Sequence, residues 1–269
     1  MYLTATYPIQ FKEVTDTIKR YYNDIYDHDY ITQNKKEMVD TFIKSFPDWF
    51  NKGKFKVKGL EKFPYVYITN GITEAIHVTM LEHGLRPVVA DKEYKSYLAH
   101  ARIYAESGKT LRNRIPFLSL PFYDTAEEHP TTQTILKGPA FIDLAWSGNC
   151  GLQGTYDLSN VSYASFSFSK MFGIQYHRIG ILYSKTPIKH FEMYKEVSYN
   201  NLVGLGMVNQ LTGFRPDYFY DKYRHVADLF CEKLDLKPTK SLWMGRHKLQ
   251  DTKVPLFYEW LEWKNETRK

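Results

Sequence analysis

Short apolar runs alternate with amphipathic stretches through the middle of the chain. The apolar runs have the length of buried strands, and the stretches between them place apolar residues at helical spacing. The predicted strands are at 65–68, 87–90, 115–118, 140–143, 161–166 and 179–183, and the predicted helices are at 72–83, closed by Gly84, and at 93–106, closed by Gly108. This alternation predicts an α/β fold with a doubly wound, mostly parallel sheet. Ligands of such sheets bind beyond the carboxyl ends of the strands.

Helical patterns flank this region on both sides. One amphipathic helix is predicted from residue 8 to residue 26, and a second from residue 35 to residue 49, ended by Pro47 and a turn at Gly53. The C-terminal part is helical again and then begins what we expect to be a small domain that stops early. The expected organisation is a helical N-terminal arm (1–58), a large α/β domain (59–202), and C-terminal helices with a reduced, truncated small domain (203–269).

The composition is that of a globular protein in solution. Hydrophobic residues make up 43% of the 269 residues and charged residues 25%. No apolar run reaches the length of a membrane span, and the N-terminus has no basic segment followed by an apolar stretch, so we expect a cytoplasmic protein without a membrane partner. Cys150 and Cys231 are too few for a disulfide framework, and neither they nor the nine histidines show metal-ligand spacing. No metal site is predicted.

The net charge of +6 does not by itself indicate a nucleic-acid partner, because the basic residues are scattered among acidic ones. The densest basic run, residues 52–58, alternates lysines with other residues. That alternation favours an edge strand or a loop whose lysines face water over a contact with a phosphate backbone. Small molecules are therefore the expected ligands.

The segment from Ser165 to Gly180 carries the clearest chemical signal in the chain. It contains a cluster of small hydroxyl side chains, then Lys170, and then Arg178 eight residues later. A lysine amine can form a Schiff base with a carbonyl compound, and hydroxyls together with a guanidinium are the donors that a phosphate group requires. A solvated surface lysine is the ordinary alternative. The segment resembles the lysine motif of fold type I pyridoxal-phosphate enzymes, in the aspartate aminotransferase-like group.

Three further segments resemble the same family, in the order that the family requires. Residues 69–76 resemble its phosphate-binding turn, residues 93–97 the segment that places an aromatic ring on the pyridine, and residues 141–146 the strand end that presents an aspartate to the ring nitrogen. The resemblance implies pyridoxal 5'-phosphate as cofactor and Lys170 as its Schiff-base lysine. It also implies cofactor contacts by Gly71, Ile72, Thr73, Ser167, Ser169 and Arg178 around the phosphate, by Asp143, Tyr94, Tyr123 and Trp146 around the ring, and by Tyr30 across a dimer.

Several of these residues also have an ordinary structural interpretation. The residues at 71–74 could simply begin a helix. Tyr94 could pack in the core, because it shares a helical stripe with Tyr97. Asp143 could cap a helix or pair with a lysine, since a carboxylate at the end of an apolar strand is costly without a cation. A protonated pyridine nitrogen would be such a cation.

The chain departs from the family pattern at three places. Residues 122–126 stand where relatives carry an asparagine-proline-threonine-glycine turn, so Tyr123 is the available donor to the ring hydroxyl. Trp146 stands where a tyrosine is common, and an indole can donate a hydrogen bond but not accept one. We expect the chain to end before the arginine that clamps the substrate carboxylate, and neither Arg215 nor Arg246 has a matching context.

The resemblance implies an aminotransferase that moves an amino group between an amino acid and a keto acid, as a homodimer with its sites at the subunit interface. Two alternatives stay open. The same site could act as a lyase or decarboxylase, because the cofactor sets the chemistry and substrate orientation selects the bond that breaks. The chain could also be a non-catalytic scaffold, as the missing carboxylate clamp suggests.

Overall fold

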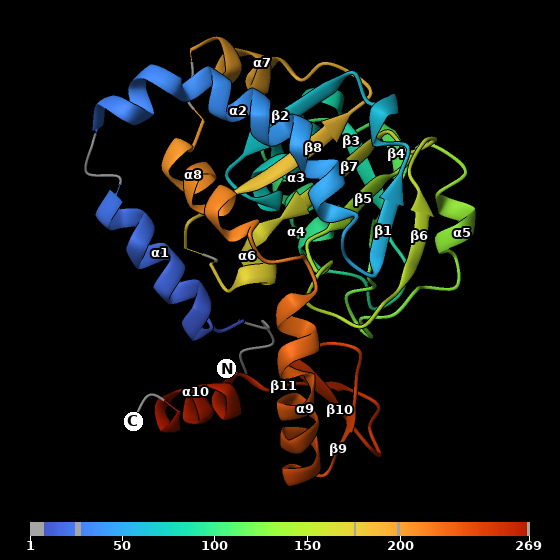
Figure 1. Ribbon diagram of the computed structural model, residues 1–269. Helices are drawn as coiled ribbons and strands as arrows, with labels where there is room; N and C mark the ends of the chain where they lie inside the picture. The colour runs from blue at the N-terminus through green and yellow to red at the C-terminus, as the bar shows by residue number, and fades with distance from the viewer. Residues whose placement is uncertain (1–7, 25–27, 175, 198–199, 268–269) are drawn as a thin grey trace.

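A six-stranded sheet lies at the centre of the molecule (Figure 1). The computed structural model describes residues 8–24, 28–174, 176–197 and 200–267, without the side chains of residues 23–35. The strand order is β2-β8-β7-β5-β4-β3. The strands are β2 (Tyr65–Thr69), β3 (Leu85–Val88), β4 (Asn113–Ser119), β5 (Phe141–Leu144), β7 (Tyr163–Ser167) and β8 (Gly180–Ser184). β3, β4, β5 and β7 are parallel, whereas β8 runs antiparallel to both of its neighbours. The predicted mostly parallel sheet is confirmed, with strand ends displaced by two residues at most.

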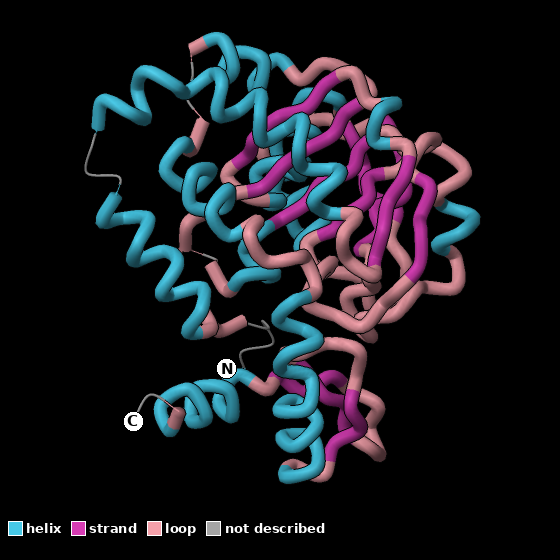
Figure 2. Tube along the Cα trace, in the orientation of Figure 1, coloured by secondary structure: helices cyan, strands magenta, loops and turns pink. Residues whose placement is uncertain are grey.

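Helices cover both faces of this sheet, which makes it doubly wound. Successive side chains of a strand point to opposite faces. On one face, Tyr163 of β7 bonds His83 of α3 (Ile72–His83), with 2.6 Å between Oη and Nδ1. On the other face, Phe166 of β7 packs against Phe46 of α2 (His28–Phe50), with ring centroids 4.9 Å apart. Figure 2 shows the strands as one layer among helices. β5, β7 and β8 are buried along their whole length, which explains their continuous apolar runs.

The remaining helices of this part connect the strands or precede them. They are α1 (Lys12–Asp24), α4 (Ser96–Glu106), α5 (Thr132–Ile135), α6 (Phe168–Phe172), α7 (Lys189–Glu196) and α8 (Leu202–Leu211), with a short 3-10 turn η1 (Leu60–Lys62). α3 ends as predicted at Gly84, which adopts the left-handed conformation.

Three of the predicted ends of the two N-terminal helices are wrong. α1 begins at Lys12 rather than at residue 8, and α2 begins at His28 rather than at residue 35. Pro47 does not end α2, which continues to Phe50. A proline in the last turn removes one backbone donor but keeps its carbonyl, and that of Pro47 accepts from the N–H of Asn51 at 3.0 Å.

The basic run at 52–58 contains β1 (Phe55–Lys58), which pairs in parallel with β6 (Gly154–Asp157) in a separate two-stranded sheet. Its side chains alternate between buried and exposed, and both lysines of the strand are exposed. The prediction that the lysines face water is confirmed. Lys58 lies 3.3 Å from the carboxylate of Asp157 on the neighbouring strand.

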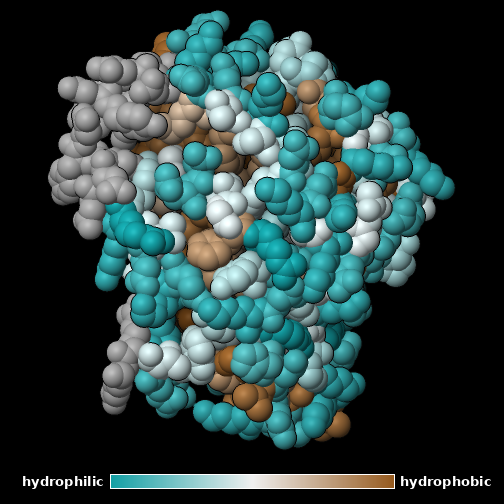
Figure 3. All heavy atoms as spheres, viewed as in Figure 1, coloured by the Kyte–Doolittle hydropathy of each residue, from teal (hydrophilic) through white to brown (hydrophobic). Residues whose placement is uncertain are grey.

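Hydrophilic side chains predominate on the face shown in Figure 3, and hydrophobic ones are visible only in small patches. Large aromatic side chains are instead fully buried, among them Phe117, Phe141, Phe166 and Trp260. Among the described residues, no helix combines the length and the apolar composition that a membrane span requires.

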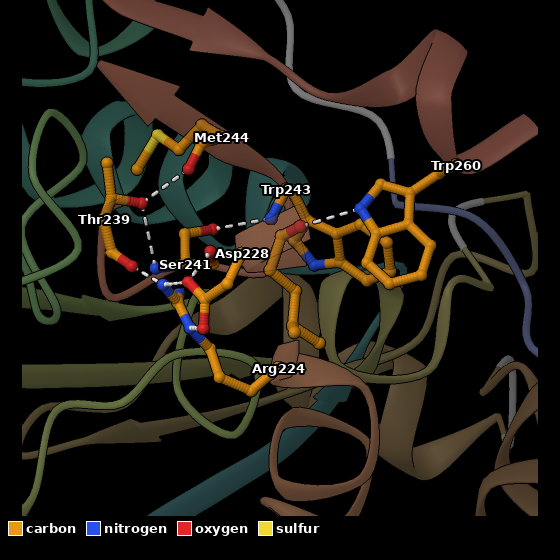
Figure 4. Close-up of polar contacts among 8 residues, drawn as sticks. Arg224, Asp228, Thr239, Ser241, Trp243, Met244 and Trp260 are labelled. Atoms are coloured by element: carbon orange, nitrogen blue, oxygen red, sulfur yellow. Dashed lines mark hydrogen bonds and ion pairs between the residues drawn. The ribbon is translucent and has the colours of Figure 1, made fainter. Parts of the chain in front are cut away.

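The C-terminal residues form a small antiparallel sheet between two helices. In chain order these are α9 (Tyr218–Lys233), β9 (Leu236–Pro238), β10 (Met244–His247), β11 (Lys253–Pro255) and α10 (Phe257–Glu266). Figure 4 shows how they are joined: Arg224 of α9 donates to the carbonyl oxygens of Thr239 and Ser241. Trp260 of α10 donates from Nε1 to the carbonyl of Leu242 at 2.7 Å. These side-chain bonds to backbone fix the sheet against both helices.

Candidate cofactor site

A cavity of about 210 Å³ lies at the carboxyl edge of the large sheet. Ten of the twelve predicted site residues line it, namely Ile72, Thr73, Tyr94, Tyr123, Asp143, Trp146, Ser167, Ser169, Lys170 and Arg178. Gly71 lies directly behind Arg178. Tyr30 belongs to α2, but its side chain lies outside the described residues. Segments far apart in the sequence thus meet at one place.

Lys170 enters the cavity from α6, the short helix that begins where β7 ends. Ser167 caps this helix, its hydroxyl accepting from the N–H of Ser169 at 3.3 Å. Burial is the main cause that lowers the pKa of Lys170 to about 8; the nearby guanidinium of Arg178 contributes to the lowering, and Asp143 acts in the opposite direction. A lower pKa leaves more of the amine unprotonated near neutral pH, and the unprotonated amine is the nucleophile.

Asp143 is buried at the end of β5. Its Oδ2 accepts from the hydroxyl of Tyr97 at 2.6 Å, and its Oδ1 accepts from the N–H of Ala145 at 2.8 Å. Burial raises the pKa of Asp143 to about 6, although both hydrogen bonds and Lys170 lower it. The residue caps no helix, and no lysine or arginine within the described ranges forms an ion pair with it. A charged group that is so buried is suited to a cation brought by a ligand.

Donors of hydrogen bonds converge on the other end of the cavity. Gly71, with φ 80° and ψ 173°, turns the chain from β2 into α3. The first turn of such a helix leaves backbone N–H groups without intrahelical partners. Nη2 of Arg178 donates to the hydroxyl of Thr73 at 3.3 Å. The hydroxyl of Ser169 is buried and has no hydrogen-bond partner among the described residues. This set of donors is suited to a phosphate group.

Arg178 reaches this end because β8 is antiparallel to its neighbours. Gly180, the first residue of β8, lies opposite Thr69 at the end of β2 and Ser167 at the end of β7. A side chain two residues before β8 is therefore at the same edge as Lys170. Arg178 itself has a positive φ of 44°, which is uncommon for a residue with a side chain. A Cβ on Gly71 would lie 2.8 Å from its Nη2, so the glycine makes room for it.

Aromatic rings form the remaining wall. The ring centroids of Tyr94 and Tyr123 are 5.1 Å apart, and those of Tyr123 and Trp146 are 6.4 Å apart. Nζ of Lys170 lies 5.6 Å from the Trp146 ring. Tyr94 lines the cavity and also packs against Tyr97 of the core, with ring centroids 5.3 Å apart.

Three polar residues that hold this wall have no recognisable signal in the sequence. The helical stripe places Tyr97 in the core, yet its hydroxyl binds Asp143. The buried carboxylate of Glu93 accepts from the N–H of Ser119 at 3.0 Å, from its hydroxyl at 2.5 Å, and from the N–H of Tyr94 at 2.8 Å. Ser119 in turn accepts from the N–H of Tyr123 at 2.7 Å. The predicted start of this helix at residue 93 is wrong, because these bonds hold Glu93 outside α4, which begins at Ser96.

The two arginines considered for the substrate carboxylate are engaged elsewhere. Arg246 of β10 pairs with Asp124 and with Asp251, each at 2.9 Å. Arg215 pairs with Asp217 at 3.2 Å and also with Asp221. Neither arginine lines the cavity. In the described part of the chain, no group of histidine, cysteine or acidic residues is placed to hold a metal ion.

No family model and no curated protein sequence matches the chain. Solved structures do. An aspartate aminotransferase from Thermotoga maritima is 12% identical, with a TM-score of 0.61 over 92% of this chain and 78% of that chain. A probable N-succinyldiaminopimelate aminotransferase from Thermus thermophilus is 12% identical, with a TM-score of 0.59 over 91% and 78%. A C-S lyase bound to pyridoxal phosphate, from Staphylococcus hominis, is 10% identical, with a TM-score of 0.53 over 90% and 73%. The chain has the fold of the fold type I pyridoxal-phosphate enzymes, as the resemblance implied.

Proposed function

We propose that this chain, on the fold of the pyridoxal-phosphate-dependent aminotransferases, is itself such an aminotransferase and moves an amino group between an amino acid and a keto acid. One observation carries the proposal. A buried lysine with a lowered pKa, a buried carboxylate and a set of phosphate donors surround one cavity at the carboxyl edge of the sheet.

The residues fit the cofactor at its phosphate and at its ring nitrogen. The unpartnered hydroxyl of Ser169, the hydroxyl of Thr73 and the guanidinium of Arg178 would hold the phosphate. Gly71 supports this, because any side chain there would displace Arg178. Asp143 would pair with the ring nitrogen, and the aromatic wall would contact the ring.

The cofactor, when bound, supplies an electron sink that stabilises negative charge at the substrate Cα. The protein supplies the rest. Asp143 would favour the protonated form of the ring nitrogen, because the positive charge there would pair with the buried carboxylate. The amine of Lys170, with its pKa near 8, would take the proton from the substrate Cα and return it at C4′ of the cofactor. The aromatic wall excludes water from the reacting atoms.

A lyase is the second candidate, because a C-S lyase has the same fold with a TM-score of 0.53. The product of the reaction separates the two. Incubation with single amino acids would yield a keto acid and pyridoxamine phosphate in the first case, and ammonia, an amine or a cleaved fragment in the second. A homodimer is part of the same proposal, with Tyr30 of each chain near the phosphate of the other.

The decisive experiment is a visible absorption spectrum of the protein after incubation with pyridoxal phosphate and removal of the excess. We expect the band of the lysine-bound cofactor in the wild type and in Lys189→Ala, a control at an exposed lysine of α7. We expect no such band in Lys170→Ala, and no transamination. A wild type without the band would support the non-catalytic scaffold instead.

A further inference from the structure

Lys253 of β11 is a buried amine without a hydrogen-bond acceptor. Its Nζ is inaccessible to solvent and has no hydrogen-bond partner among the described residues. The amine lies over the ring of Tyr123, 3.1 Å from the centroid. A lysine ammonium has three donors, and burying one without an acceptor is costly. The aromatic face compensates only part of this cost.

The charges around Lys253 do not neutralise it. The charged groups that act on it are Asp124, Lys170, Lys95 and Arg246. Asp124 is the only carboxylate among them, and it is already paired with Arg246 at 2.9 Å. Both side chains of that pair are largely buried, with 12% and 13% of their surface exposed. The carboxylate that attracts Lys253 is thus taken by Arg246, and among the described residues no carboxylate forms an ion pair with Lys253.

The fold places this amine beside the candidate site. The ion pair between Arg246 and Asp124 fastens the C-terminal sheet to the loop that follows β4. Tyr123 stands in that loop, lines the cavity on one side and contacts Lys253. The cavity already has donors for a phosphate at its other end, so an anion near Lys253 would be a second, separate negative group.

We propose that Lys253 binds the carboxylate of the substrate, and that the site therefore takes amino and keto acids rather than amines without a carboxylate. The inference rests on the proposed function. The four-carbon side chain of lysine is flexible and can move its ammonium around the edge of the Tyr123 ring. A carboxylate bound there would supply the acceptor and the counter-charge that the buried amine lacks.

The test is calorimetric titration of the cofactor-free full chain with propionate, with propionamide as its uncharged counterpart. Repeating the titration with Arg178→Ala distinguishes this site from the donors around Arg178. We expect propionate, but not propionamide, to bind the wild type. Lys253→Met should weaken propionate binding about tenfold or more, because it removes a charge-assisted hydrogen bond. Lys253→Arg should restore part of it.

Lys237→Met is the matched control, because it removes an exposed lysine from β9 of the same small sheet. It should bind propionate like the wild type. Equal binding by the wild type and Lys253→Met would overturn the proposal, and so would a wild type that does not distinguish propionate from propionamide. Near-ultraviolet circular dichroism checks the fold, and Lys253→Gln replaces the methionine variant if that variant does not fold.

The proposal also has a pH dependence. Burial lowers the pKa of Lys253 to about 8, Lys170, Lys95 and Arg246 lower it as well, and Asp124 acts in the opposite direction. The cationic amine binds the carboxylate, so the affinity for propionate should fall as the pH rises above about 8. The titration uses no pyridoxal phosphate. A wild type that does not bind propionate would therefore contradict only the role of Lys253. A missing cofactor band would contradict the role of Lys170 and the proposed function.

Discussion

Asp143 shows how a single residue can be suited to a ligand at the expense of stability. Its pKa is about 6 in the folded chain, against an ordinary value of 3.8, because the carboxylate is buried. The folded state therefore binds the proton more tightly than the unfolded state does. The stability that comes from this group is present at low pH and is lost as the pH rises from about 4 to about 6. At neutral pH the charged carboxylate destabilises the cofactor-free protein.

We therefore expect Asp143→Asn to raise the thermal midpoint of the cofactor-free protein at pH 7.5. The gain should be at most about 3 kcal/mol, which is the free energy equivalent of the shift in pKa from 3.8 to about 6. Between pH 4 and pH 6, the stability of the variant should also fall less steeply than that of the wild type. Glu93, whose pKa burial raises to about 6, keeps a decline of the same sign.

Thermal unfolding at several pH values checks this expectation. Asp251→Asn is a useful contrast, because Arg246 lowers the pKa of that exposed carboxyl and the variant should gain nothing at pH 7.5. A midpoint of Asp143→Asn that is equal to or below that of the wild type at pH 7.5 would contradict the account of Asp143.

At the scale of elements, the turn from β2 into α3 is the part that depends most on its backbone. Gly71 has a positive φ, and a Cβ there would meet Arg178. Gly108, which follows α4, has nearly the same φ of 78°, but a Cβ there would meet nothing within 4 Å. Comparing alanine variants at these two glycines therefore distinguishes the effect of positive φ from the effect of displacing Arg178.

We expect Gly71→Ala and Gly108→Ala each to lose stability, about 1–3 kcal/mol, because both place a side chain at positive φ. Only Gly71→Ala should lose affinity for pyridoxal phosphate, about tenfold or more, because it displaces Arg178. Affinity for pyridoxal, which has no phosphate, should change little. Fluorescence titration with both ligands measures this. Equal affinity of the two variants for pyridoxal phosphate would be evidence against a phosphate contact by Arg178.

The sequence was sufficient for those elements whose signal is local. The six strands, the end of α3 at Gly84 and the segment around Lys170 each have a pattern within a few residues. The start of α4 could not be predicted, because the carboxylate of Glu93 binds the distant Ser119. Lys253 had no motif at all. Its position beside Tyr123 depends on how the C-terminal sheet packs, which no local pattern encodes.

At the scale of the whole molecule, the proposed homodimer predicts a mass in solution of twice the 31.8 kDa of one chain. Tyr176, which is 87% exposed and stands two residues before Arg178 in the sequence, is one candidate for the interface. Light scattering coupled to gel filtration, repeated over a dilution series, measures the mass. A mass of one chain at every concentration would rule out a site shared between two subunits.

The position of β8 between two strands that are distant in the sequence has a consequence for the order of folding. Its two partners, β2 and β7, are separated by nearly a hundred residues of sequence, and β8 lies between them. A pairing over such a distance closes a long loop and contributes to slow folding. The cavity has both of its ends only after β8 has docked, because Arg178 arrives with that strand. A ribosome-bound chain that has emerged only as far as Lys170 would therefore have the amine but no complete cavity, which can form only after synthesis has passed residue 184.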